Sequence, residues 1–270
     1  MSVWVASLNS GSNGNCYYIG NEHDAVLIDA GISCKETEAR MARLGLSMRK
    51  VKAIFISHEH SDHIRGLTVL SKKYNLPVYI TPPTLYHSGL QIDGQLLRTF
   101  KANVGVNIGS FTITPFSKMH DAAEPHSFTI TCGDLKVGVF TDLGVVCENL
   151  ITHFQQCHAA FLEANYDEDM LEQGRYPYHL KRRIRGGKGH LSNKQALALF
   201  ESYRAEHLTH LFLSHLSKDN NCPDLALNLF KSKAGNTEVV VASRYVETAL
   251  YHITAAQVCY PPSKAQYTLF

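Results

Sequence analysis

Short apolar runs separated by turn-forming residues fill most of the first half of the chain. Runs rich in β-branched and aromatic residues predict strands at 3–8, 16–20, 25–30, 52–57, 77–80, 97–100, 110–115, 127–132 and 136–141. The segment SGSNGN (10–15) consists of residues that favour turns and separates the first two runs. We therefore expect this half to be mainly β-structure.

Apolar residues at helical spacing appear between these runs and again near the end. They predict helices at 35–45, 62–74, 192–204 and 223–233, with strands at 159–163 and 209–214. We assign no element to the polar stretch at 165–190. Strands first, then strands mixed with helices, indicate two sheets with helices outside.

The chain shows no convincing internal repeat, low-complexity tract or linker. We predict one domain over residues 1–270, of the α/β (α+β) class, with two mixed β-sheets flanked by helices. Hydrophobic residues make up 44% of the 270 residues, enough for a sizeable core.

Charge and cysteine usage narrow the class of protein. The formal net charge is +2, which argues against a protein that binds nucleic acid through charge alone. There is no apolar run of 18 residues and no signal-peptide pattern, so we expect a cytoplasmic protein with no membrane partner. The seven cysteines are scattered without a CxxC pair, which disfavours a zinc ribbon or a disulfide framework and predicts reduced thiols.

Four potential metal ligands follow the apolar run at 52–57 within six positions: His58, His60, Asp62 and His63. His58 and His60 are two apart at a strand end, so both side chains can point the same way. Asp62 and His63 come after the turn, at the start of the expected helix. The simplest arrangement that uses all four side chains has two adjacent cations, one bound by His58 and His60 and the other by Asp62 and His63. The alternative is a polar loop of surface histidines, and the density of ligands after a buried strand disfavours it.

The motif SHEHSDH resembles the signature of the metallo-β-lactamase superfamily, whose fold is an αββα sandwich with a two-metal site at one edge of the sheets. The resemblance implies three more ligands in order: His120 in KMHDA, Asp142 in VFTDLG as the bridge between both metals, and His215 in LFLSHLS. One metal would then be held by His58, His60, His120 and Asp142, and the other by Asp62, His63, His215 and Asp142.

Longer stretches, among them SGSNGNCYYIG, HEHSDHIRGL, HDAAEPHSF, LEANYD and SHLSKDNN, resemble the branch of this superfamily that includes YycJ, VicX and WalJ. Its members are small cytoplasmic bacterial proteins described as DNA exonucleases. Nitrogen and oxygen ligands without sulfur suit zinc or manganese as the two divalent ions. His60 argues against the flavin-dependent di-iron relatives, for which a glutamate would be expected there.

Two cations can share a hydroxide that attacks a phosphodiester, and they can clamp its oxygens. The pairing of LEAN with GHLSNKQ resembles elements of the tRNA 3′-processing nucleases, and it implies that Glu163 orients His190, which protonates the leaving oxygen. On this basis Asp62, Glu163 and His190 are the expected catalytic residues. The alternative is that Ser192 and Gln195 simply form a capping box, although a helix N-terminus at Ser192 and Asn193 also favours a phosphate.

A basic segment precedes His190 and is a candidate phosphate-binding surface: Lys181, Arg182, Arg183, Arg185 and Lys188. A solvated charged face is the alternative. Tyr176 and Tyr178 could stack on bases or anchor the loop.

Four further residues are weaker candidates. Ser12, Asn13 and Asn15 could line the cleft, and Asp29 could support the ligands from behind.

These features predict a two-metal phosphodiesterase acting on nucleic acid, with DNA exonuclease activity implied by the resemblance alone. Only 72 residues separate Asp142 from His215, too few for the large inserted domain of the β-CASP ribonucleases. Three alternatives stay open: an RNA-processing nuclease, a thioesterase or lactonase on the same fold, and a metal-stabilised binding protein without catalysis. Oligomeric state, polarity and native metal are not determined by the sequence.

Overall fold

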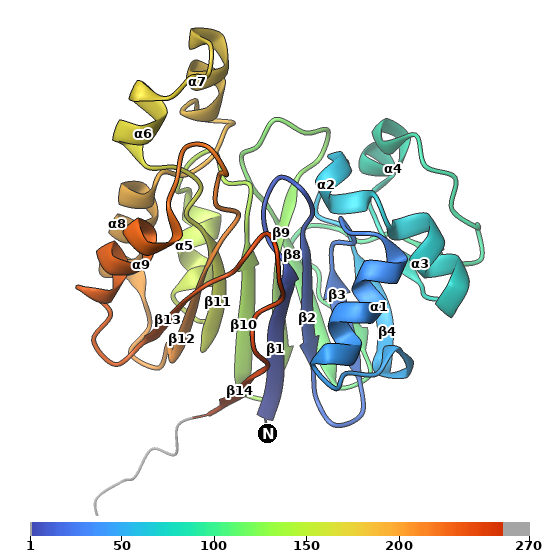
Figure 1. The fold of residues 1–270 in the computed structure, drawn as a ribbon. Helices are drawn as coiled ribbons and strands as arrows, with labels where there is room; N and C mark the ends of the chain where they lie inside the picture. The colour runs from blue at the N-terminus through green and yellow to red at the C-terminus, as the bar shows by residue number, and fades with distance from the viewer. Residues whose placement is uncertain (1, 256–270) are drawn as a thin grey trace, which may run out of the picture.

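Two mixed β-sheets pack face to face, and helices cover both outer faces (Figure 1). The computed structural model describes residues 2–255. Their strands are β1 (Ser2–Asn9), β2 (Cys16–Gly20), β3 (Ala25–Ile28), β4 (Val51–Phe55), β5 (Val78–Tyr79), β6 (Leu97–Arg98), β7 (Val106–Ile108), β8 (Phe111–Ser117), β9 (His126–Cys132), β10 (Leu135–Phe140), β11 (Ala159–Glu163), β12 (His210–Ser214), β13 (Glu238–Val241) and β14 (Tyr251–Thr254). Their helices are α1 (Cys34–Arg43), the 3₁₀ turn η1 (Met48–Lys50), α2 (Ser61–Ile64), α3 (Leu67–Tyr74), α4 (Pro82–Ser88), α5 (Glu148–Phe154), α6 (Glu168–Gln173), α7 (Tyr178–Ile184), α8 (Asn193–Tyr203) and α9 (Pro223–Lys231).

The two sheets share one pattern of strand pairing. The first has the order β14-β1-β2-β3-β4-β5-β6, and the second has the order β13-β12-β11-β10-β9-β8-β7. In the first sheet, pairs from β14 to β3 are antiparallel and pairs from β3 to β6 are parallel. In the second, pairs from β7 to β10 are antiparallel and pairs from β10 to β13 are parallel. The sandwich therefore repeats a topology although the sequence shows no repeat.

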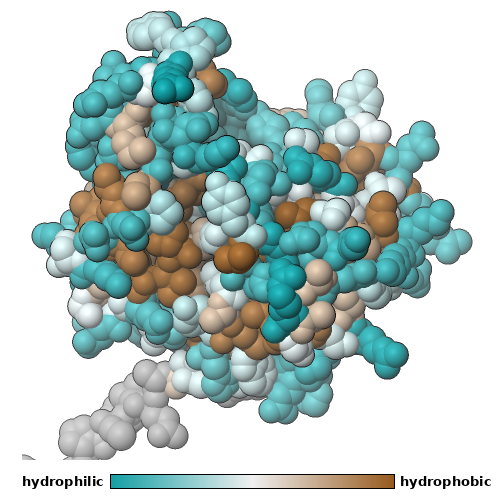
Figure 2. All heavy atoms as spheres, in the orientation of Figure 1, coloured by the Kyte–Doolittle hydropathy of each residue, from teal (hydrophilic) through white to brown (hydrophobic). Residues whose placement is uncertain are grey.

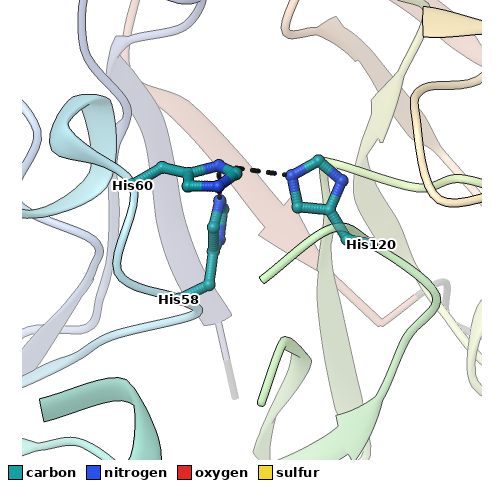
Figure 3. Close-up of side chains that lie close together, drawn as sticks. All are labelled: His58, His60 and His120. Carbon is teal, nitrogen blue, oxygen red and sulfur yellow. Dashed lines mark hydrogen bonds between the residues drawn. The ribbon is translucent and has the colours of Figure 1, made fainter. Parts of the chain in front are cut away.

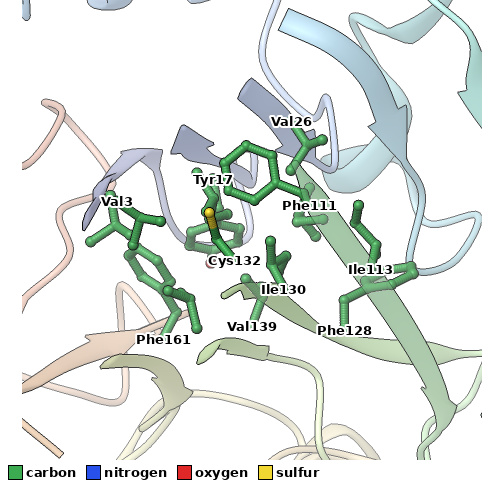
Figure 4. Close-up of a cluster of buried hydrophobic side chains, with 14 of the residues drawn as sticks. Val3, Tyr17, Val26, Phe111, Ile113, Phe128, Ile130, Cys132, Val139 and Phe161 are labelled. Carbon is green, nitrogen blue, oxygen red and sulfur yellow. The ribbon is translucent and has the colours of Figure 1, made fainter. Parts of the chain in front are cut away.

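The main core fills the space between the sheets, where large side chains from both inner faces interdigitate (Figure 4). Phe128 and Phe161 of the second sheet and Val3, Tyr17 and Val26 of the first are all at most 1% exposed. A second cluster lies between the second sheet and α5, α8 and α9, and a third between the first sheet and α1 and α3. Burial of this much apolar surface is the main favourable term in folding.

The outer surface carries apolar side chains unevenly. Figure 2 shows hydrophobic surface gathered over the part of the molecule where Figure 1 draws α9 and β13. Within residues 2–255, every helix is too short or too polar to cross a membrane.

The expected fold class and two-sheet arrangement are confirmed, but three assignments differ. The helix expected over 62–74 is divided at Gly66, whose N–H donates to Ala30 O (2.8 Å) in the neighbouring loop instead of to a helical carbonyl. The polar stretch at 165–190 contains α6 and α7, whose few apolar residues gave no periodic signal. The prediction also missed five short elements, each at most seven residues long: β7, β13, β14, α4 and α5. The single-domain prediction extends to residues 1 and 256–270, which lie outside the described part.

Three residues within two positions of a strand end adopt left-handed backbone conformations. The φ angles are +62° for Asp29 after β3, +55° for Asp142 after β10 and +58° for His215 after β12. Such angles are uncommon for residues other than glycine and concentrate at functional sites. All three side chains are buried at the same edge of the sandwich.

Gly31 fixes the approach of the Asp62 loop to this edge. Its N–H donates to Asn15 O (2.8 Å), the Asn15 N–H donates to Asp62 O (2.7 Å), and a Cβ on Gly31 would lie 1.6 Å from Asp62 O. We expect Gly31→Ala to lower the free energy of unfolding by about 1–3 kcal/mol and to weaken metal binding, because the Asp62 backbone must move. Denaturant titration and bound-metal analysis measure the two effects. Gly94→Ala is the control, since Gly94 faces open space; equal stability of the two variants would contradict this role.

Candidate metal centre

The seven expected ligands converge at one edge of the sandwich from four separate segments. The loop after β4 supplies His58, His60, Asp62 and His63, and loops after β8, β10 and β12 supply His120, Asp142 and His215. Figure 3 shows His60 and His58 from one segment pointing toward His120 from another. Close groups of potential ligand atoms include His58 with His60 and His120, and Asp62 with His63 and His215. The expected ligands thus lie together, and their division between two ions stays a prediction.

In the first group, ring nitrogens face one another. His58 Nε2 lies 3.0 Å from His60 Nδ1, and His120 Nε2 lies 3.4 Å from the same atom. His120 Nδ1 donates to Gly189 O (3.0 Å), and His58 Nδ1 donates to Ser57 Oγ (2.9 Å), whose own proton goes to Asp29. Both Nε2 atoms are therefore bare acceptors, and His60 Nδ1 can donate to only one of them. A cation at this point would satisfy all three nitrogens.

In the second group, backing contacts aim histidine nitrogens at two carboxylates. His63 Nδ1 donates to Asp29 Oδ2 (2.7 Å), which leaves His63 Nε2 facing Asp62 Oδ2 at 3.5 Å. His215 Nε2 lies 3.5 Å from the same oxygen. Asp29 is thus the backing group that the sequence proposed among its weaker candidates. Metal-binding histidines usually donate their second ring N–H in this way, which fixes the tautomer and the orientation of the ring.

Asp142 lies between the two groups. Its Oδ2 is 3.2 Å from His63 Nε2, and its Oδ1 is 3.4 Å from His215 Nε2 and 3.8 Å from His120 Nε2. The carboxylate is buried, and Oδ2 accepts no well-formed hydrogen bond from residues 2–255. A buried, unsatisfied carboxylate oxygen is costly unless a cation or donor contacts it. Its position is the one expected of a bridging ligand.

The electrostatics of the site favour positive charge. Burial lowers the pKa of His215, but Asp142 and hydrogen bonds to Asp62 and Glu163 outweigh it and raise this pKa to about 10. Burial lowers the pKa of His120 to about 4, so its ring is neutral and ready to bind a metal. The residues therefore fit divalent cations, and a donor set of nitrogen and oxygen suits zinc or manganese.

Glu163 supports this centre from beneath and contacts His190. Its Oε1 lies 2.7 Å from His190 Nδ1 and 3.3 Å from His215 Nδ1, while Oε2 accepts from the backbone N–H groups of Leu143 (2.7 Å) and Leu191 (3.1 Å). Burial raises the pKa of Glu163, but His190 and the hydrogen bonds from both histidines lower it to about 2. The carboxylate is therefore ionised; one oxygen holds the two rings and the other holds two backbone N–H groups.

A cavity of about 190 Å³ lies over the centre, lined by ligands together with His190, Arg183 and Lys188. Arg183 Nε donates to Asp121 Oδ2 (2.7 Å), next to the ligand His120. The structure thus brings two of the expected phosphate-binding residues to the cavity.

The remaining expected phosphate contacts lie elsewhere. Arg185 pairs with Glu172 (2.7 Å), and Arg182 is exposed outside the cavity lining. Ser192 and Asn193 are at most 1% exposed. The Ser192 hydroxyl donates to Glu168 (3.0 Å) and takes part in a capping box with Gln195, the alternative that the sequence also allowed. These two side chains are closed off from a substrate, and we leave them out of the proposed contacts.

Several contacts around the site were absent from the sequence interpretation. Asn165 Nδ2 donates to His215 O (2.7 Å), and Lys118 Nζ donates to Thr141 O (2.7 Å), next to Asp142. Asp121 directly follows His120, so adjacency to a ligand was the available signal. Lys118 and Asn165 are buried polar residues whose role depends on contacts between distant segments.

The structure places some of the weaker loop candidates at the metal site and others away from it. Asn15 Nδ2 lies 3.2 Å from Asp62 Oδ2, and Ser12 lines the cavity. The Asn13 side chain instead donates to Arg244 O (2.8 Å). The Tyr176 hydroxyl donates to Asp219 (2.9 Å), which is the anchoring alternative, and Tyr178 is 74% exposed.

Comparisons with known proteins agree with this architecture. The family model described as Beta-lactamase superfamily domain matches residues 24–215. The chain is 36% identical over 229 residues to Exodeoxyribonuclease YycJ of Bacillus anthracis (84% of this chain, 87% of the relative). It is 32% identical over 224 residues to Exodeoxyribonuclease WalJ of Streptococcus pneumoniae serotype 2 (81% and 83%). The crystal structure of the metallo-β-lactamase fold protein YhfI from Bacillus subtilis superposes with a TM-score of 0.72 at 16% identity, covering 93% of this chain and 100% of that one.

The matched range spans well over half of the chain and includes all seven expected ligands. The protein belongs to the metallo-β-lactamase superfamily of hydrolases. Within it, the long matches connect the chain to proteins named YycJ and WalJ, and the resemblance noted in the sequence is confirmed.

Removal of metal is expected to destabilise the protein, because the buried carboxylates then lose their counter-charge. A ligand present at 1,000 times its dissociation constant stabilises by about 4 kcal/mol, which corresponds to roughly 8–16 °C in a chain of this size. Differential scanning calorimetry before and after chelation measures the shift, and adding zinc or manganese back should restore it. An unchanged melting temperature in protein proven to be metal-free would contradict the fit of this site to cations.

Proposed function

We propose that the protein is a metal-dependent phosphodiesterase that acts on nucleic acid, and specifically a DNA exonuclease. The observation that carries the proposal is the Glu163–His190 pair, 2.7 Å apart, which lies beside the converged ligands and shares a cavity with Arg183 and Lys188. The names of the two long relatives support DNA as the substrate and an exonucleolytic mode. Activity in the cytoplasm stays a prediction.

The ligands of the two groups would hold two divalent ions, with Asp142 shared between them. When bound, such ions activate a water near neutral pH and neutralise charge on phosphoryl oxygens.

The chain's own residues supply binding and proton transfer. Arg183 and Lys188 hold phosphate oxygens at the mouth of the cavity. Glu163 holds the His190 ring through Nδ1, so that the other ring nitrogen is free to give a proton to the leaving oxygen. Because Glu163 also contacts His215, loss of its charge disturbs the acid and a ligand together.

The direct test uses metal-loaded protein with single- and double-stranded DNA and RNA labelled at either the 5′ or the 3′ end. Stepwise release of mononucleotides from DNA is expected. Cleavage of RNA alone would favour an RNA-processing role, and binding without turnover would favour a non-catalytic protein. Hydrolysis of thioesters or lactones while every nucleic acid stays intact would contradict the proposal.

Arg183 and Lys188 should set the salt dependence of binding. Replacing both with alanine is expected to raise KM for single-stranded DNA by about tenfold or more and to reduce the slope of log K against log salt by about 1.4. Fluorescence anisotropy across a salt series measures this slope. Arg49→Ala/Lys72→Ala removes the same charge from exposed positions outside the cavity lining and should leave it unchanged. A thioesterase acting on a small neutral substrate would tolerate loss of Arg183 and also of its neighbour Arg182.

A further inference from the structure

A second cavity, of about 250 Å³, lies where α9 begins and β13 ends. Its walls include Leu216, Pro223 and Val241, and its rim carries Arg244 and Tyr245. It lies on the side of the molecule where Figure 2 shows hydrophobic surface over α9 and β13. The proposed chemistry does not use this cavity, although the stretches SGSNGNCYYIG and SHLSKDNN contribute Ser10, Leu216 and Lys218 to its lining.

The cavity adjoins the metal centre through a shared wall. Ser10 lines it, and the Ser10 hydroxyl accepts a hydrogen bond from the backbone N–H of the ligand His215 (2.8 Å). Arg244 Nη2 donates to Ser12 Oγ (3.1 Å), and Ser12 lines the metal cavity. The segment from Ser10 to Ser12 therefore borders both cavities.

The segment that carries Arg244 and Tyr245 is fixed through its backbone. Arg40 Nη2 donates to Tyr245 O (2.9 Å), Asn13 Nδ2 donates to Arg244 O (2.8 Å), and Ser10 N donates to Ser243 O (3.1 Å). These bonds leave the Tyr245 ring free, and that side chain is 67% exposed. An exposed aromatic ring on a rigid backbone loses little entropy on binding.

Cationic groups at the rim lack anionic partners. Arg244 and Lys218 form no ion pair with a carboxylate of residues 2–255, and Arg244 Nη1 is buried without a hydrogen bond to any of them. An anionic oxygen in the cavity would therefore meet positive charge that no carboxylate of residues 2–255 compensates.

We propose that this cavity is a nucleotide subsite, which binds the nucleotide unit next to the scissile phosphate. The inference rests on the proposed function and deepens it. The base lies against the apolar wall and stacks on Tyr245, and the phosphate lies against Arg244 and Lys218. The volume is below the roughly 300–1,000 Å³ of pockets for drug-sized ligands, so it suits a single nucleoside unit.

The subsite complements the basic groups at the other end of the metal cavity. Arg183 and Lys188 line the metal cavity with His190, whereas in the second cavity Ser10 contacts His215 and Arg244 contacts Ser12. A strand held at both ends places its phosphodiester over the metals with little freedom, which is the main contribution that positioning makes to catalysis.

The test compares Tyr245→Ala, Tyr245→Phe and Arg244→Ala with wild type on two substrates. On bis(p-nitrophenyl) phosphate, which has no base, all variants should match wild type within about twofold. On single-stranded oligonucleotides, Tyr245→Ala and Arg244→Ala should each raise KM by about tenfold, whereas Tyr245→Phe keeps the ring and should not. Tyr86→Ala and Arg98→Ala, which remove the same side chains outside both cavities, are the controls.

Substrates that lack a single base show which nucleotide contacts Tyr245. A substrate lacking the base next to the scissile phosphate should bind wild type as weakly as Tyr245→Ala binds the normal substrate, and the two losses should not add. Additive losses, or unchanged KM in both variants, would overturn the subsite.

Failure of the proposed function would look different, because wild type would then cleave no oligonucleotide. Calorimetric titration with deoxyadenosine monophosphate still decides the subsite in that event. Tenfold weaker binding by Arg244→Ala than by wild type supports the subsite. Equal affinity of the two proteins, or no binding by wild type, overturns it.

Discussion

Replacing Asp62 with alanine is expected to reduce nucleic-acid cleavage by about 10³-fold or more. Its Oδ2 lies 3.5 Å from both His63 Nε2 and His215 Nε2, so we propose it as an oxygen ligand of the second ion, together with Asp142. Losing a metal ion forfeits several kcal/mol of charge stabilisation in the transition state, and each 1.36 kcal/mol is about tenfold in rate. Steady-state cleavage of labelled DNA measures the loss.

Bound-metal analysis of the same variant shows whether the loss has the expected cause. The metal content should fall from about two ions to about one. Asp134→Ala is the matched control, because Asp134 is exposed in the turn between β9 and β10, at the far ends of these strands from Asp142. Full metal content with lost activity would mean that Asp62 acts in another way, and unchanged activity would contradict its role altogether.

Replacing His190 with alanine is expected to lower kcat by about 10²–10⁴-fold while KM changes little. The side chain lines the cavity and contacts Glu163 at 2.7 Å, and it belongs to neither expected ligand set. A general acid matters most when the leaving oxygen is a poor leaving group. The loss should therefore be large for DNA and small for bis(p-nitrophenyl) phosphate, whose nitrophenolate departs without a proton.

Glu163→Gln removes the charge that holds both His190 and His215. We therefore expect it to lower metal content together with activity on both substrates, whereas His190→Ala keeps its metal. Equal losses on both substrates in His190→Ala would indicate that His190 is needed for metal binding or folding instead of proton transfer. Metal content and melting temperature distinguish those two cases.

The sequence predicted the metal centre far better than the surroundings that support it. His58, His60, Asp62 and His63 are dense, and they directly follow a continuously apolar strand, so local pattern was enough. His120, Asp142 and His215 were found only because their order and strand-end positions resemble a family. Alone, each would have been taken as structural.

Residues whose function depends on tertiary contacts escaped detection. Lys118 and Asp121 come from the loop between β8 and β9 and Arg244 from the loop between β13 and β14, and they lie near the site only because the sheets pack as they do. The same limit explains the expected phosphate contacts. Charge density identified the basic segment, but the geometry of α7 directs only Arg183 to the cavity, while Arg185 turns to Glu172.

Short elements were missed for a related reason. Strand β14 has four residues and is stabilised by pairing with β1, more than 240 positions away in the sequence. Helix α7 has no buried residue, so no apolar periodicity could reveal it. Local propensity is a weak guide where long-range pairing or polar contacts decide the structure.

The most direct test of the account is anomalous diffraction from crystals of the metal-loaded protein. We predict two peaks roughly 3.5–4 Å apart, with the Asp142 carboxylate between them, His58, His60 and His120 around one, and Asp62, His63 and His215 around the other. A single peak without Asp142, or full occupancy at a position remote from His215, would contradict the central claim that these seven side chains form one two-metal centre.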